Sequence, residues 1–95
     1  MSKREAYVEK FKAKLDEWNA EISKMEAKAK GASADSKLKY EEQITEVKSR
    51  RDKARDRLKE VRESSDEAWE DLKAGADQAW KSVSDAVTEA WSRFK

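Results

Sequence analysis

Apolar residues in the first third of the chain recur with alternating steps of three and four. The series extends over more than three heptads, and charged side chains fill most of the positions between its members. This repeat is typical of an α-helix that packs along a narrow seam against another helix. The seam contains Val8, Phe11, Leu15, Trp18, Ile22 and Met25, followed by Ala29 and Ala32.

A second seam of the same kind follows a short break. Gly31 stands where a helix C-cap glycine would, and residues 32–36 are small or polar. We therefore expect helices over about residues 3–30 and 36–63, joined as an antiparallel hairpin. The alternative is one unbroken helix through Gly31, at a cost of about 1 kcal/mol for the glycine. The second seam contains Tyr40, Ile44, Val47, Arg51, Ala54, Leu58 and Val61.

From residue 66 the apolar pattern changes to a repeat of eleven residues. Trp69, Trp80 and Trp91 are equivalent positions in DEAWEDLKAGA, DQAWKSVSDAV and TEAWSRFK. Eleven residues in three turns give a nearly straight stripe, whereas a heptad seam follows a left-handed supercoil. The two stripes should diverge, which leaves the second one free as an interaction face. The expected face comprises Trp69, Leu72, Ala76, Trp80, Val83, Val87, Trp91 and Phe94.

The connection at Ser64–Ser65 decides how this third segment is arranged. It contains no Gly or Pro to reverse the chain, so we expect the second helix to continue to about residue 93. Residues 66–95 would then project as a C-terminal amphipathic segment beyond a hairpin formed by residues 1–65. However, Ser64 and Glu67 have the spacing of a capping box, as do Ser2 and Glu5, and this favours a three-helix bundle as the alternative. The predicted fold class is all-α in both cases.

The residue types give no support to catalysis. The chain has no His and no Cys, which removes the commonest general base and the thiolate and imidazole ligands of zinc. Carboxylate pairs such as Asp52/Asp56 and Glu42/Glu46 have the i,i+4 spacing of a helix-borne metal site, but 45% of the residues are charged and solvated surface groups are expected. We predict a non-enzymatic protein without catalytic residues, cofactor or metal site.

Two other partners are suggested by local composition. The Trp repeat could lie on a membrane surface, although its excess of acidic residues would be repelled by anionic lipids. Residues 48–62 could contact nucleic-acid phosphates, but the near-neutral net charge of +1 and the absence of aromatic residues in this stretch favour a salt-bridged helix face instead. The basic residues are Lys48, Arg50, Arg51, Lys53, Arg55, Arg57, Lys59 and Arg62.

The opening YVEKFKAKLDEWNAEI and the closing DEAWEDLKAGADQAWKSVSDAVTEAWSRF resemble a family of small bacterial coiled-coil proteins linked to stress responses, with cyanobacterial and proteobacterial members. The more specific parts of the likeness are residues 15–20 and the Glu67-Ala68-Trp69 start of the repeat. The resemblance implies a bacterial, stress-linked role, and it brings no catalytic residues or cofactor. Gly31 departs from the more helical connection expected of such proteins.

Together these patterns predict a coiled-coil protein that forms homo-oligomers through its Trp-rich face, with a scaffolding or protective role under stress. Shielding of client proteins by the same face is equally compatible with the sequence. No apolar run approaches the about 20 residues of a membrane span, and the start lacks the apolar core of a signal peptide. We therefore expect a cytoplasmic protein, with the periphery of the inner membrane as the alternative.

Overall fold

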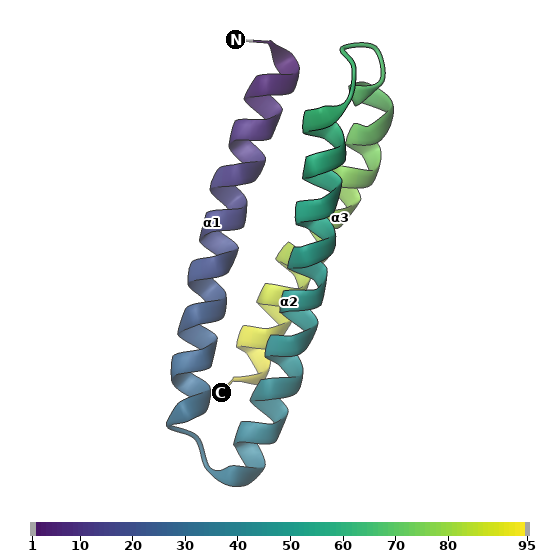
Figure 1. The fold of residues 1–95 in the computed structure, drawn as a ribbon. Helices are drawn as coiled ribbons and strands as arrows, with labels where there is room; N and C mark the ends of the chain where they lie inside the picture. Colours follow the sequence, from purple (N-terminus) through teal and green to yellow (C-terminus); the bar gives the residue numbers. More distant parts are fainter. Residues whose placement is uncertain (1, 95) are drawn as a thin grey trace.

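The chain folds into three long helices. The computed structural model describes residues 2–94 and contains α1 (Lys3–Lys30), α2 (Ala34–Glu63) and α3 (Trp69–Arg93). The helices run down, up and down in the view of Figure 1, so that α1 and α3 are parallel to each other and antiparallel to α2. The resulting rod measures 51 × 19 × 18 Å. The all-α class is confirmed, and the arrangement is the three-helix bundle that the sequence allowed as an alternative.

The α1–α2 hairpin forms as the sequence predicts. Ser2 caps α1, since its Oγ accepts a hydrogen bond from the Glu5 amide at 3.1 Å. Gly31 ends the helix with φ −89°, in a right-handed conformation, and its amide donates to the carbonyls of the last turn. Ser33 then caps α2, so the second helix begins at Ala34, two residues before the expected start.

The expected continuation of α2 through Ser64–Ser65 is wrong. Ser64 adopts an extended backbone (φ −76°, ψ 161°), and its hydroxyl donates to the Val61 carbonyl at 2.6 Å, which closes the end of α2. Ser65 Oγ accepts from the Ala68 amide at 3.1 Å and initiates the turn that leads into α3. Each serine hydroxyl thus satisfies one backbone group at the reversal, and the chain turns with negative φ throughout residues 2–94.

The hairpin seam is buried as expected. Among the predicted apolar members of the two seams, Leu15, Ala32 and Tyr40 are half-buried. The others are at most 8% exposed, and these are Val8, Phe11, Trp18, Ile22, Met25, Ala29, Ile44, Val47, Ala54, Leu58 and Val61. Arg51, which interrupts the seam, lies at its edge and donates from Nη1 to Asn19 Oδ1 of α1 at 2.9 Å. Both core clusters also take residues from α3, so residues 66–94 share the core of the hairpin.

The expected divergence of α3 from the hairpin is also wrong, because α3 packs through a different set of residues. Its buried positions include Trp69, Ala76, Val83 and Ala90, which are separated by steps of seven. Leu72, Ala79 and Ala86 lie between them and complete a heptad seam that continues the geometry of the hairpin. Four of these seven residues are alanines. Their repeat is harder to recognise in the sequence than the repeat of the larger indoles at steps of eleven.

Candidate interaction surface

Aromatic side chains separate α1 from α3. The two backbones approach each other less closely than either approaches α2. The Trp80 ring lies edge-on between Phe11 and Trp18 of α1, with centroid distances of 5.0 and 5.8 Å. Nearer the start of both helices, Tyr7 and Trp69 lie 6.1 Å apart. Indole and phenyl rings thus fill the wider space between α1 and α3, whereas small side chains lie in the closer contact between α2 and α3.

The predicted Trp-rich face is covered by the protein's own hairpin. Trp69, Ala76, Val83 and Phe94 are at most 9% exposed. The remaining members, Leu72, Trp80, Val87 and Trp91, are half-buried and pack against the core clusters. The expectation that this stripe lacks a cover within the chain is therefore wrong, because the reversal at Ser64–Ser65 returns it to the hairpin. Only one flank of the stripe reaches the surface.

That flank borders a groove of about 450 Å³ between α1 and α3, called here the α1/α3 groove. Trp18, Val87 and Trp91 form its apolar lining. The Trp91 indole nitrogen donates to Glu21 Oε2 at 2.7 Å, and this bond fixes the ring across the end of the groove. The polar lining residues include basic, acidic and hydroxyl side chains and comprise Lys14, Glu17, Glu21, Lys24, Ser84 and Thr88, with Ala20 between them.

A second polar contact joins α1 and α3 near the start of both helices. The Tyr7 hydroxyl donates to Asp77 Oδ1 at 2.7 Å, and Lys73 Nζ lies 5.7 Å from the centre of the Tyr7 ring. Partial burial is the largest cause that raises the pKa of Tyr7 above its ordinary value, followed by the hydrogen bond to Asp77 and the negative charge of that carboxylate.

This shift predicts a specific loss of stability in alkali. The folded state holds the Tyr7 proton more tightly than the unfolded chain, where the pKa is 10.0. The resulting stability is present below about pH 10 and is lost as the pH rises above it. Urea titrations at about pH 9 and pH 11 should show a larger drop for the natural chain than for Tyr7→Phe. Equal drops in the two proteins would contradict this assignment.

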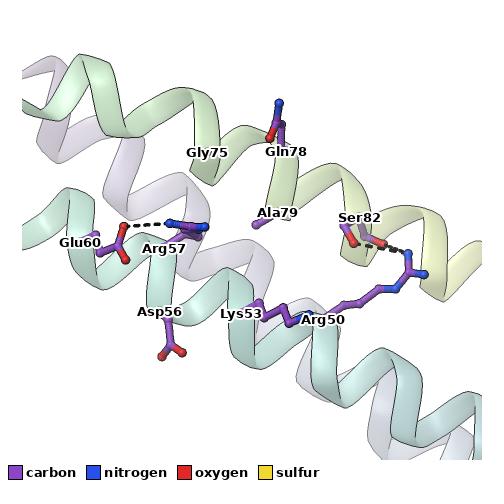
Figure 2. Close-up of a pocket in the computed structure, with 9 residues that line it drawn as sticks. All are labelled: Arg50, Lys53, Asp56, Arg57, Glu60, Gly75, Gln78, Ala79 and Ser82. Atoms are coloured by element: carbon purple, nitrogen blue, oxygen red, sulfur yellow. Dashed lines mark hydrogen bonds and ion pairs between the residues drawn. The ribbon is translucent and has the colours of Figure 1, made fainter.

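Three of the eight basic residues in this segment of α2, Lys48, Arg50 and Arg51, make a polar contact with a neighbouring helix. Lys48 pairs with Glu26 of α1 at 3.5 Å, and Arg50 Nη1 donates to the carbonyl and hydroxyl oxygens of Ser82 in α3 at 3.3 Å each. Figure 2 shows the α2/α3 side, where Arg57 turns back to Glu60 and faces Gly75. The basic side chains are thus divided between the two edges of α2. This arrangement gives less support to phosphate-backbone binding than a single basic face would.

The structure adds two general observations. Within residues 2–94, no group of three or more acidic side chains is placed to hold a metal ion. In the same part of the chain, none of the helices is both long enough and apolar enough to span a bilayer.

Sequence reasoning missed one exposed apolar residue and the heptad seam of α3. Leu38 is the exposed large apolar residue of the described part of the chain. It lies in the first turns of α2 and is 65% exposed. It lies off the heptad seam, and this offset is the signal that could have identified it. The alanine heptad of α3 could have been found by asking which small residues recur at steps of seven.

Comparison with known proteins adds no relative. A scan against protein-family models and searches of curated proteins and of solved structures found no match to this chain. The resemblance to bacterial coiled-coil stress proteins therefore stays an expectation from the sequence.

Proposed function

We propose that this chain is a non-enzymatic helical-bundle protein that associates with a second copy of itself through the α1/α3 groove. The observation that carries the proposal is the half-buried position of Val87 and Trp91 beside Trp18 along an open groove. Aromatic residues at the edge of a folded core are enriched in protein interfaces, because they bury a large area at low entropic cost. The proposed binding surface therefore contains fewer residues of α3 than the predicted Trp-rich face.

The charges around the groove are compatible with pairing of two copies. Lys14 and Lys24 flank Glu17 and Glu21 on the α1 side, so these four side chains carry no net charge together. Lys14 already pairs with Glu17 at 2.9 Å, an exposed contact that costs little to rearrange. A modest, reversible association is expected from an apolar strip of this width, since small interfaces are typical of weak complexes.

The physiological role that fits this association is scaffolding or protection under stress in the bacterial cytoplasm. The support comes from the resemblance noted in the sequence, which implies a bacterial, stress-linked role. Shielding of client proteins by the same groove would use the same apolar lining.

Sedimentation equilibrium over a wide concentration range tests the self-association. The natural chain should exceed its monomer mass of 11.0 kDa as concentration rises. Thr88→Arg places a bulky charge at the groove and should shift the association at least tenfold toward higher concentration. Thr88 is exposed and arginine is the better helix former, so the fold should be unaffected.

The matched control is Ala74→Arg, on an exposed part of α3 outside the groove. This variant should associate like the natural chain. A mass of 11.0 kDa at every concentration, or equal effects of the two arginines, would refute self-association through this groove.

A further inference from the structure

Helix α3 carries two overlapping apolar faces. The bundle uses the heptad set, in which Ala76, Ala86 and Ala90 are at most 4% exposed. The eleven-residue set instead contains the buried Phe94 and three half-buried residues, Trp80, Val87 and Trp91. The inner sides of these three residues pack against the hairpin, with Trp80 between Phe11 and Trp18, and their outer sides reach the surface. The eleven-residue period of 3.67 residues per turn gives a straight stripe, and a straight stripe suits a flat surface better than a supercoiled seam.

The polar contacts that hold α3 to the hairpin are few. Among residues 2–94 the ion pairs found in the structure do not join α3 to α1 or α2. Hydrogen bonds link Asp77 to Tyr7, Trp91 to Glu21, Ser82 to Arg50 and the Phe94 carbonyl at the end of α3 to the Tyr40 hydroxyl, and all of them are exposed or partly buried. Alanines fill much of the α3 seam, and an alanine side chain buries little apolar area. Detachment of α3 would therefore break a small number of directional contacts.

The connection before α3 is anchored separately. Arg4 of α1 donates to the Ser64 carbonyl and pairs with Asp66 at 3.0 Å. These contacts keep the end of α2 beside the start of α1 even if α3 moves. Figure 1 places this connection at one end of the rod, while the last turn of α3 packs nearer the opposite end, where Ala90 and Phe94 share a core cluster with Ala29. A rotation at Ser64–Ser65 would thus move the C-terminal end of α3 the furthest.

We propose that α3 detaches from the hairpin by rotation at Ser64–Ser65 and lies along an electrically neutral lipid surface with its eleven-residue stripe facing the lipid. Indole rings favour the headgroup region of a bilayer, and three of them share this stripe. The helix has five acidic and three basic residues, which disfavours an anionic surface and leaves a zwitterionic one. Twenty-five residues give a helix about 37 Å long, which lies flat and does not cross.

Energy transfer between two labels tests the movement directly. The chain has no cysteine, so Ala27→Cys and Ser92→Cys provide two specific attachment sites on exposed residues. Both sites flank the cluster that joins Ala29 to Ala90, so transfer is efficient in the closed bundle. Adding small phosphatidylcholine vesicles should bind the protein and reduce the transfer strongly.

The other outcomes of this experiment overturn the proposal. No binding to phosphatidylcholine, binding with unchanged transfer, or binding only to vesicles with phosphatidylserine would each do so. Loss of transfer that depends on protein concentration without vesicles would show that a second copy, and not lipid, receives α3.

A pair of substitutions tests which face meets the lipid. Val87→Asp puts a charge in the eleven-residue stripe and should weaken vesicle binding at least tenfold, while Ala74→Asp on the exposed side should leave it unchanged. Circular dichroism verifies that both variants are folded. Thr88→Arg separates this proposal from self-association, because Thr88 lies outside the stripe: it should weaken the dimer and retain lipid binding. Equal effects of the two aspartates would refute the assigned face.

Discussion

Replacement of Phe11 by alanine is expected to lower the free energy of unfolding by about 3–5 kcal/mol. Phe11 is 0% exposed, and its ring contacts Trp80 at 5.0 Å and Trp18 at 6.0 Å between centroids. Removal of the ring leaves a cavity at the place where α1 and α3 meet. Because a domain of this size is stable by roughly 5–15 kcal/mol, the variant should be close to unfolding at room temperature. Urea denaturation followed by circular dichroism measures the change.

Leu38→Ala is the matched control for this substitution. It removes another large apolar side chain, but one that is 65% exposed, so its effect should stay within about 0.5 kcal/mol. A loss of less than about 1 kcal/mol for Phe11→Ala would mean that the aromatic contacts between α1 and α3 do not form in solution.

The second large effect is expected from a charge in the alanine seam of α3. Ala90→Glu should destabilise the bundle by about 3–5 kcal/mol, since it places a carboxylate without a partner at a position that is 0% exposed. Glutamate and alanine are both good helix formers, so the loss reports on packing and not on helix propensity. Thermal and urea denaturation provide the measurement.

Ala74→Glu controls for the added charge on an exposed position of the same helix, and it should be nearly neutral. The comparison also decides between the two apolar periods. Ala90 belongs to the heptad seam and lies outside the eleven-residue stripe. If Ala90→Glu were as harmless as Ala74→Glu, α3 would not pack through its alanines.

The hairpin could be predicted because its seams are made of large residues. Phe11, Trp18 and Val47 repeat with a period that only a packed helix pair explains, and the seam they belong to is buried. The two ends of α1 could also be predicted, since Ser2 and Gly31 are strong helix-end signals. Tertiary context changed these boundaries by no more than two residues.

The position of α3 against the hairpin was predicted only as the alternative, for two physical reasons. Gly and Pro are the usual signals of a chain reversal, whereas Ser64 and Ser65 reverse it through side-chain hydrogen bonds that also occur on a continuous helix surface. The conspicuous indoles also drew attention to a period of eleven, while packing is decided by Ala76 and Ala90, whose small size allows close approach. As a result, the candidate site is reduced from the whole stripe to the groove beside Val87 and Trp91.

The crossing of Trp18 and Trp80 provides an intrinsic optical signal of tertiary structure. The two indoles are 5.8 Å apart at an interplanar angle of 80°, and each belongs to a different helix. Their near-ultraviolet circular dichroism therefore depends on the docking of α3 against α1, whereas the far-ultraviolet signal depends only on the helices themselves. The ratio of the near-ultraviolet to the far-ultraviolet signal would therefore distinguish loss of α3 docking from unfolding of the helices without any label.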